Sequence, residues 1–572
     1  MSQVFNIEVV TSKTSLPILK VNDYYLHSKY DPKKEAEQFA NHQYTENHVH
    51  VLFGYGYGYF AKALKNKCKE GDHFLIIDPL FNEIEGLITY EEFDVISDIN
   101  EKIIEMTLDS LLNDYNVKVK VICSPNYDKL FPQQYKTVLK TVKELISDNL
   151  VASNTVNYFA EIWQENYIQN LYHIYEDESL SSLEKRYNLP VVIAAGGPSL
   201  TKQIPLLKKM QNHVIIIAAG STVNTLLHYG IEADFIVSID GSIANYKHFE
   251  ENFFENSYLI YSTRNHYGIR NQFKKCAFSF IPSFETSVYH HIEQITLKQL
   301  PSLLGGASVA NYALVIGQYI STGPVALIGQ DLAYTNNQTH AMYNKRFTNI
   351  DDTFKEDRGT FYTDGYNGEE VLTDAVFLSM KKGFEQIADY FGSEVSFFNC
   401  TEGGAKIKGF VQIPFNNFYE SIDRLEEKNL QLDLKKDIKA ANEWQEFYHK
   451  IQKEINNYRE IERQLNKGLI IINESYVKQA FIEKNLKGLD RVDKNVKKLI
   501  KKVSMSTILE PIIMDIVNNY LPIYGETEQE KYIRIYKQNS SLYNGLLNAT
   551  KLSKIYTKNL LEKVEKEKLG GK

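Results

Sequence analysis

Three short apolar segments between residues 191 and 240 constrain the fold of this chain more than any other feature. Each is rich in β-branched residues and too short to be a helix, and segments of helical length separate them: Val191–Ala195, Val214–Ala219 and Phe235–Ile239. This alternation is typical of consecutive βα units in a parallel sheet whose strands are buried on both faces. We therefore expect an α/β domain whose ligand site lies beyond the carboxyl ends of these strands.

Small and polar residues follow each expected strand. Glycine allows the backbone to approach a ligand closely, and the amides that open the next helix can bind an anion. The first turn alone is equally compatible with a strand-to-helix turn that binds nothing, but a second such turn at the neighbouring strand end favours a nucleotide site. The candidate binding residues are Gly196, Gly197, Pro198, Ser199, Gly220, Ser221, Thr222 and Asp240.

Asp240 ends a buried strand, where a carboxylate is costly unless it is hydrogen-bonded or faces the cleft. It can accept from a ribose hydroxyl or a cytosine amino group, or bind a metal ion. No second Asp follows at DxD spacing, so a metal site has little support. A further anion site, or a packing turn, is expected where a helix begins after Gly305, Gly306 and Ser308.

Asp331 and Tyr334 follow another expected strand, Val325–Ile328, and should face the same crevice. The loop that begins here, Leu332–Asn367, is longer than most structureless connections, which favours a functional role. It contains His340, whose ring suits the removal of a proton from an attacking hydroxyl. An exposed histidine without a role is the alternative. We take His340 and Asp331 as the catalytic candidates.

The rest of the chain predicts three further parts. Residues 1–148 should form a Rossmann-like α/β domain, because a strand, the glycine-rich turn Gly54–Gly58, a helix and a strand ending in Asp78 follow one another. That turn either binds a dinucleotide or S-adenosylmethionine, or only packs helix against strand. A helical connector is expected over 149–189, the central domain over 190–414 and an all-α domain over 415–572, where glycine and proline are scarce.

Bulk properties restrict the partners. The net charge of −8 and the pI near 6.0 do not favour a nucleic-acid partner. The four cysteines form no CxxC pair, which argues against a disulfide framework and a cysteine zinc site. The sequence has no signal peptide pattern and no apolar stretch of the ~18 residues that a membrane span requires. The chain is therefore expected to be cytoplasmic.

Five segments in order resemble the motility-associated factor (Maf) family of flagellin glycosyltransferases. The glycine-rich turn of the first domain and the helical tail also resemble those of this family. The five segments are AAGGPSL (194–200), SID (238–240), GGASVANYALVIGQYI (305–320), GQDLAYTNNQTHA (329–341) and NCTEGGAKIKG (399–409).

The resemblance implies transfer of a nonulosonic acid, pseudaminic or legionaminic, from its CMP-activated form to Ser or Thr hydroxyls of flagellin, as flagellum assembly and motility require. It also implies a central domain similar to bacterial sialyltransferases, which need neither a metal nor a cofactor besides the donor. In that fold tyrosines contact the phosphate and a histidine acts as base. We carry these roles onto Tyr334, Tyr343 and His340. The transfer is expected to be an inverting single displacement.

Two other functions stay open. The GGPSL core also resembles an archaeal ATP-dependent pyrophosphokinase that acts on a pterin alcohol. The other alternative is a flagellin-binding chaperone without catalytic activity. Its helical tail would pair with helices of the partner. A methyltransferase role for the first domain is a weaker option. The particular nonulosonic acid, the number of acceptor sites and the formation of a homo-oligomer are left open.

Overall fold

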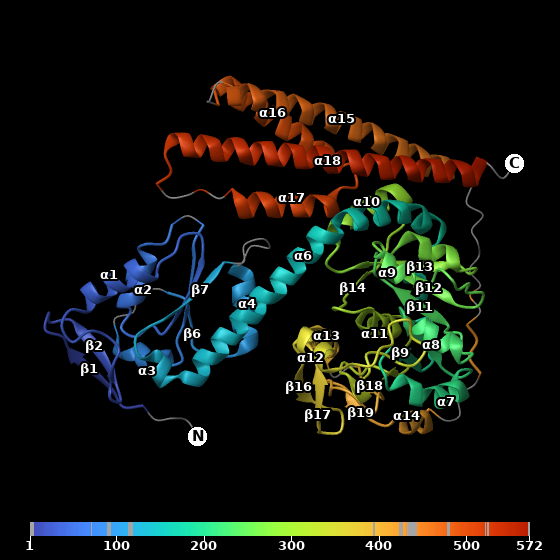
Figure 1. Cartoon of the computed structure of the whole chain (residues 1–572), viewed down its shortest axis with the longest axis horizontal. Helices are drawn as coiled ribbons and strands as arrows, with labels where there is room; N and C mark the ends of the chain where they lie inside the picture. The colour runs from blue at the N-terminus through green and yellow to red at the C-terminus, as the bar shows by residue number, and fades with distance from the viewer. Residues whose placement is uncertain are drawn as a thin grey trace. The chain divides into compact units, whose positions relative to one another are not determined.

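The computed structural model divides the chain into two compact units, each described here by itself (Figure 1). The first unit comprises Met1–Tyr158 and Glu510–Leu542, and the second comprises Phe159–Leu509 and Tyr543–Lys572. The structure describes residues 5–69, 71–88, 93–111, 118–392, 395–422, 427–430, 432, 443–477, 481–520, 522 and 525–569.

The first unit contains a four-stranded parallel sheet of order β6-β5-β4-β7. Its strands are β4 (Val49–Phe53), β5 (His73–Ile77), β6 (Val95–Ile96) and β7 (Val119–Cys123). The helices of this part are α1 (Pro32–Gln43), α2 (Tyr59–Lys65), α3 (Phe81–Ile84), α4 (Glu101–Leu111) and α5 (Tyr127–Leu130). A small antiparallel sheet precedes them: β1 (Ile7–Thr11), β2 (Pro17–Val21) and β3 (Tyr24–Tyr25). The predicted Rossmann-like fold is confirmed.

The second unit is built around a large parallel sheet with strand order β14-β13-β12-β11-β10-β9-β15-β18-β19. On one side of β9 (Val191–Ala194) the strands are β10 (Ile215–Ala219), β11 (Phe235–Ser238), β12 (Tyr258–Ser262), β13 (Ala277–Pro282) and β14 (Ser302–Leu303). On the other side they are β15 (Val325–Ile328), β18 (Phe397–Asn399) and β19 (Val411–Gln412). The order reverses between β9 and β15, and this topological switch point is where such sheets bind ligands.

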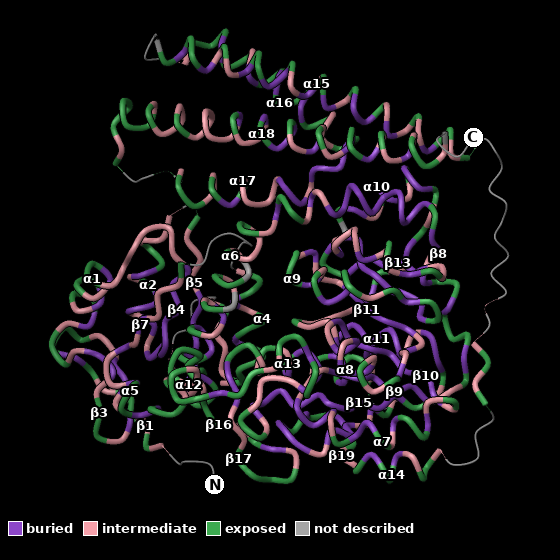
Figure 2. The backbone as a smooth tube through the Cα atoms, turned by 45° about the vertical axis from the view of Figure 1, so that its right-hand side comes forward, coloured by how far each residue is buried: buried purple, intermediate pink, exposed green. Residues whose placement is uncertain are grey.

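Alternate residues of the central strands enter two different cores. In β9, Val192 and Ala194 pack into one core and Val191 and Ile193 into the other, as the two-residue period of a strand requires. The first core includes residues of α7 (Leu200–Met210), α8 (Thr222–His228) and α10 (Thr286–Thr296). The second includes residues of α11 (Val309–Ile320) and α13 (Ala375–Phe391). Figure 2 shows these strands and α11 as mostly buried stretches.

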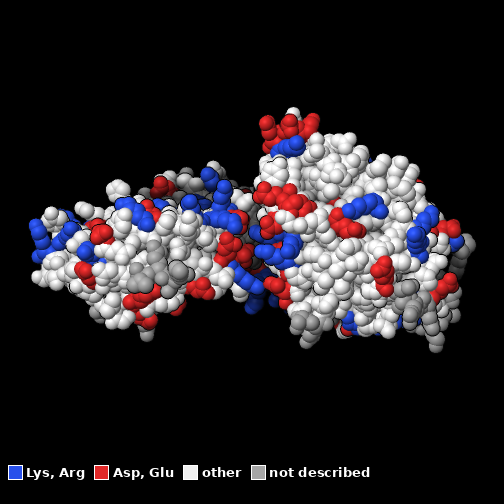
Figure 3. Space-filling view, turned by 90° about the horizontal axis from the view of Figure 1, so that it is seen from below, with Lys and Arg blue, Asp and Glu red and all other residues white. Residues whose placement is uncertain are grey.

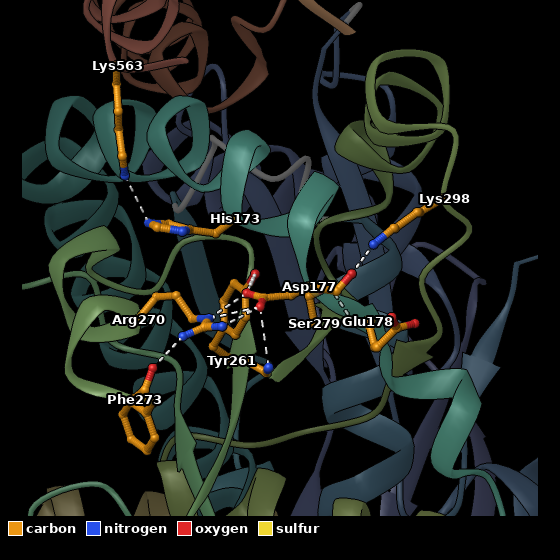
Figure 4. Close-up of polar contacts among 10 residues, drawn as sticks. His173, Asp177, Glu178, Tyr261, Arg270, Phe273, Ser279, Lys298 and Lys563 are labelled. Carbon is orange, nitrogen blue, oxygen red and sulfur yellow. Dashed lines mark hydrogen bonds and ion pairs between the residues drawn. The ribbon is translucent and has the colours of Figure 1, made fainter. Parts of the chain in front are cut away.

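A buried ion pair joins the end of α6 (Pro132–Glu176) to this sheet (Figure 4). Arg270 donates from Nε and Nη2 to the carboxylate of Asp177, with shortest distances of 2.7 Å. The Tyr261 hydroxyl, from β12, donates to the same carboxylate at 3.1 Å. Because a buried charge must be paired and hydrogen-bonded, this cluster fixes how α6 meets β12 and β13.

Four helices form most of the C-terminal part: α15 (Glu443–Val477), α16 (Glu483–Ile500), α17 (Ser506–Asn519) and α18 (Glu528–Leu569). The all-α prediction is confirmed for the described residues; 423–426, 431, 433–442, 478–480, 521, 523–524 and 570–572 lie outside them. The compact units differ from the predicted domains, because α6 runs continuously through residue 148 and Glu510–Leu542 groups with the first unit. None of the described helices is both long and apolar enough to cross a membrane.

The segment 332–367, expected to lack secondary structure, is more ordered than predicted. It contains helix α12 (Asp352–Arg358), which the Asp351 side chain caps at its start. It also contains β16 (Phe361–Asp364), which pairs antiparallel with β17 (Glu370–Thr373).

On the face seen in Figure 3, acidic and basic residues are interspersed over the surface.

Candidate functional site

The turns that follow β9 and β15 are bonded to each other. The Gly197 N–H donates to the Gly329 carbonyl at 2.7 Å. A side chain at Gly197 has no room, since its Cβ would lie 2.2 Å from Asp331 Oδ2. The Ser199 hydroxyl donates to Asp331 Oδ1 at 2.6 Å, and the Ser199 N–H donates to Oδ2 at 3.1 Å. The Asp331 carboxylate thus occupies the backbone amide of Ser199, the residue at the start of α7.

Asp331 is almost fully buried, at 1% exposure. Burial raises the pKa of its carboxyl group, while the hydrogen bonds from Ser199 oppose that rise. The bonds from Ser199 therefore favour the charged form of the carboxyl group, against the effect of burial. This arrangement makes Asp331 a group that holds the turn in place.

The second turn lies at the adjacent strand end. The Gly220 N–H donates to Val237 O at 3.1 Å, and Gly220 has φ +51°, in the left-handed region that favours glycine. The Thr222 hydroxyl donates to Ala219 O at 2.9 Å. Beyond β11, Asp240 accepts from the Ser242 N–H at 2.8 Å and its hydroxyl at 3.1 Å, at the start of α9 (Ile243–Tyr246).

Residues 339–346, which we call the docked segment, lie across both turns. The Ala341 N–H donates to Gly196 O at 2.9 Å, and the Met342 N–H donates to Thr201 Oγ1 at 3.2 Å. The Thr225 hydroxyl returns a bond to Met342 O at 3.2 Å. These bonds place His340 beside the first turn, where a Cβ at Gly196 would lie 3.6 Å from His340 Cδ2.

A cavity of about 460 Å³ opens where the strand ends and the docked segment meet, which is within the usual size range of small-molecule sites. Of the residues predicted from the sequence, it is lined by Gly196, Gly197, Pro198, Gly220, Ser221, Thr222, Asp240, Gly306, Ser308, Asp331 and His340. The structure therefore brings most of the predicted site residues to the wall of one cavity.

The other predicted residues lie elsewhere. Tyr334 donates its hydroxyl to Asp374 Oδ2 at 2.7 Å and, with Ser199, lines a separate cavity of about 680 Å³ on the other side of Pro198. Tyr343 is half exposed and stacks on His228 with ring centroids 3.5 Å apart. Gly305 packs over the Tyr312 ring. In this structure neither Tyr334 nor Tyr343 lines the 460 Å³ cavity.

Ser308 begins α11 as its cap. Its hydroxyl oxygen accepts from the Asn311 N–H, and the Asn311 side chain accepts from the Ser308 N–H at 3.0 Å. These reciprocal bonds satisfy amides at the helix start that would otherwise lack partners. Ser308 still lines the cavity, so the cap positions its backbone there.

Two histidines face the cavity, and both are neutral at pH 7. Burial, with the nearby positive charge of Arg346, lowers the pKa of His340 to about 4. The same two causes lower the pKa of His248 to about 4. A neutral imidazole can accept a proton, so each ring meets the first requirement of a general base.

Several buried polar atoms around the cavity lack hydrogen-bond partners within the described chain. They include His248 Nδ1 and Gln330 Oε1. Such groups cost free energy when buried and unpaired, so their gathering here indicates a polar ligand. Arg346 also lines the cavity, and its guanidinium forms no ion pair with the described residues.

Sequence reasoning missed several lining residues, among them Trp163, His248, Arg264, Gln330 and Arg346. Arg264 follows β12 and Gln330 follows β15, so the strand-end rule that identified Asp331 could have found both. Trp163 comes from α6 and His248 follows α9, and no local pattern marks either. Among the described residues, no group of three or more His, Cys, Asp or Glu side chains could hold a metal ion.

The glycine-rich turn of the first unit is filled by its own chain. Asp78 accepts from the Tyr55 N–H at 2.7 Å and the Tyr127 hydroxyl at 2.8 Å. The Tyr57 N–H donates to His27 Nε2 at 2.8 Å. A Cβ at Gly54 would lie 2.4 Å from the Tyr127 ring. The amides that would face a dinucleotide or S-adenosylmethionine phosphate or sugar thus already have partners.

Comparisons with known proteins agree with this architecture. A family model described as 6-hydroxymethylpterin diphosphokinase MptE-like matches residues 165–337. Among solved structures, the chain is similar to the Maf glycosyltransferase from Magnetospirillum magneticum AMB-1, with a TM-score of 0.61 and 15% identity over 99% of this chain and 95% of that chain. None of the curated proteins compared with the sequence matches it. The resemblance inferred from the five segments is confirmed for the fold, along nearly the whole chain.

Proposed function

We propose that this chain, which shares the fold of a Maf glycosyltransferase, is itself a glycosyltransferase. Its donor is a CMP-activated nonulosonic acid of the pseudaminic or legionaminic type, and its acceptors are Ser or Thr hydroxyls of flagellin. The single observation that supports this most is the cavity at the switch point, where two glycine turns and His340 line one space. The structural neighbour spans both units, whereas the MptE-like match ends before His340.

The donor phosphate has three candidate partners. The Ser199 N–H at the start of α7 already bonds to Asp331, so it is not available to the phosphate. Within the described chain, the N–H groups of Gly196 and Ser221 form no hydrogen bond, and both residues line the cavity. We assign the phosphate to these two amides and to the Arg346 guanidinium, which is suited to binding phosphate oxygens.

His340 is the proposed general base. Its neutral ring accepts the proton of the acceptor hydroxyl while that oxygen attacks the anomeric carbon, and CMP leaves with its phosphate already charged. A donor phosphate beside the ring offsets the charge of Arg346 and so raises the pKa of His340 toward the pH at which a base is most effective. Asp331 has a positioning role, because its carboxylate is committed to Ser199.

Intact-mass measurement of flagellin tests the proposal. Flagellin is co-expressed with this chain, with and without enzymes that make a CMP-nonulosonate, and a mass increase that requires both the chain and the donor is expected. An unchanged mass with donor present would contradict the proposal. Thermal-shift comparison of CMP with ATP and magnesium separates it from the pyrophosphokinase alternative, since only CMP should stabilise the chain.

A further inference from the structure

The end of the cavity farthest along the sheet, beyond β12 and β13, is lined by Trp163, Arg264, Phe284 and Glu285. None of these residues has a role in the function proposed above. Their arrangement is specific: two aromatic rings and one buried carboxylate surround a single guanidinium. We refer to these four residues as the arginine corner.

The Arg264 guanidinium is held on several sides. Its carbon lies 4.9 Å from the centroid of the Trp163 ring and 5.7 Å from that of Phe284. Its Nε lies 3.0 Å from Glu285 Oε1, and the Arg264 side chain is 11% exposed. Aromatic faces and a carboxylate together fix the plane of a guanidinium.

The backbone around Arg264 is also fixed. The Asn170 side chain, from α6, donates to Thr263 O at 3.0 Å and to Asn265 O at 2.7 Å. The Thr263 hydroxyl donates to Glu285 Oε2. Burial raises the pKa of Glu285, whereas the charge of Arg264 opposes the rise. The corner is therefore a preformed structure and not a flexible surface side chain.

The two terminal amino groups of this guanidinium remain unused. Within the described residues, no acceptor bonds to Nη1 or Nη2 of Arg264, although its Nε faces Glu285. Arg264 Nε forms an ion pair with Glu285 but no hydrogen bond. The free Nη pair presents two parallel donors, which match the two oxygens of a carboxylate. The Arg264 side chain is only 11% exposed, and low exposure to solvent strengthens such a contact.

We propose that Arg264 binds the carboxylate of an acidic sugar donor and so selects nonulosonic acids over neutral sugars. This inference rests on the proposed function. A CMP-nonulosonate carries two anionic groups, a phosphate and a sugar carboxylate, and the cavity carries two guanidinium groups, Arg346 and Arg264. With the phosphate assigned to Arg346 and the glycine turns, the carboxylate is left for the arginine corner.

The test compares CMP, which has no carboxylate, with CMP-pseudaminic and CMP-legionaminic acid by titration calorimetry on the full chain. In the double variant Arg264→Met with Glu285→Gln, both charges are removed, so that no buried carboxylate is left unpaired. We expect CMP to bind within about twofold of wild type and the acidic donor to bind about 10- to 100-fold more weakly, as loss of a charged hydrogen-bond pair predicts. The milder Arg264→Lys keeps the ion pair and should show a smaller loss confined to the acidic donor.

Tryptophan fluorescence gives a second readout, because the chain has two tryptophans, Trp163 and Trp444. In Trp444→Phe, the emission of Trp163 should change when the acidic donor binds and stay unchanged with CMP. Equal weakening of CMP and acidic donor in the double variant, or no weakening of either, would overturn the role of Arg264 while leaving the proposed function intact. Failure of the wild-type chain to bind CMP or the acidic donors would overturn both.

Discussion

Ser199 and Asp331 join the two turns on either side of the topological switch point. The Ser199 hydroxyl lies 2.6 Å from Asp331 Oδ1, and the Ser199 N–H bonds to the same carboxylate. Both residues are buried, at 4% and 1% exposure. The carboxylate thus takes the place that a ligand anion occupies at many helix starts, and the site must bind its phosphate with other groups.

Ser199→Ala should destabilise the second unit. The substitution removes a buried hydrogen bond to a charged group, which typically contributes about 1.5–3 kcal/mol. Urea denaturation measures the loss. Ser283→Ala is the matched control, because Ser283 is exposed and should change stability by less than about 0.5 kcal/mol. Equal effects of the two substitutions would show that the Ser199 bond contributes nothing.

Gly197→Ala should abolish CMP binding, because the new Cβ would lie 2.2 Å from Asp331 Oδ2 and 2.5 Å from Gly329 O. Either contact forces the two turns apart and displaces the cavity wall. Titration calorimetry with CMP is the measurement. Gly86→Ala serves as control, since nothing lies within 4 Å of its Cβ position, and it should bind CMP normally. Normal binding by Gly197→Ala would mean that the turn is not part of the site.

His340→Ala should lower transfer by about 10²- to 10⁴-fold, the usual contribution of a general base, and leave CMP binding within a few-fold. In wild type, kcat/KM should be constant near neutral pH and fall as the pH decreases through about 4, where burial and Arg346 place the pKa of His340. His248→Gln, at the same cavity, is the comparison and should cost less. The opposite ranking would assign the base to His248.

Arg346→Met should weaken CMP binding, since it removes the guanidinium assigned to the phosphate. It should also move the acid limb of the kcat/KM profile to higher pH, because the charge of Arg346 lowers the pKa of His340. Lys345→Met is the control on the same segment, as the Lys345 ammonium pairs with Glu251 at 2.8 Å. A profile that does not move would place Arg346 too far from the ring to act on it.

Asp78 should make the stability of the first unit depend on pH. Burial raises the pKa of Asp78 to about 6 in the folded chain, against an ordinary value of about 3.9. The folded state then binds the proton more tightly, so stability is highest below pH 4 and falls as the pH rises to about 6. Relative to Asp78→Asn, wild type should lose on the order of 3 kcal/mol over this range. Asp94→Asn, at an exposed position, should follow wild type; if Asp78→Asn does so too, Asp78 is not the titrating group.

The sequence predicted three adjacent strands of the central sheet to within about a residue, because apolar β-branched segments between glycines leave few alternatives. The predicted segments 191–195, 214–219 and 235–239 correspond to β9, β10 and β11. The same reasoning located most of the cavity wall, since carboxyl ends of parallel strands share one edge. Segment 332–367 was predicted without structure because its helix and hairpin are short and depend on contacts with other segments, such as the pairing of β16 with β17.

The residues that sequence reasoning missed reach the cavity through tertiary structure. Trp163 arrives on α6, far from the strand ends in sequence, and His248 follows a helix of a single turn. Tyr334 and Tyr343 show the reverse. A strand end suggested the cavity for Tyr334 and the family resemblance suggested a phosphate contact for both, but Tyr334 bonds to Asp374 and Tyr343 stacks on His228. Spacing along the chain cannot distinguish a side chain that enters a site from one that turns away.

The Ser199 N–H in the first glycine turn already bonds to the Asp331 carboxylate. This turn therefore keeps its shape whether or not substrate is present. The first glycine turn is therefore preorganised, and binding there costs little conformational entropy. Residues 339–346 are bonded to the first turn through the Ala341 N–H and to the second through the Asn344 side chain, which donates to Ser221 O and Oγ at 3.4 Å. These bonds hold the docked segment, and with it His340, beside a turn that already has its final shape.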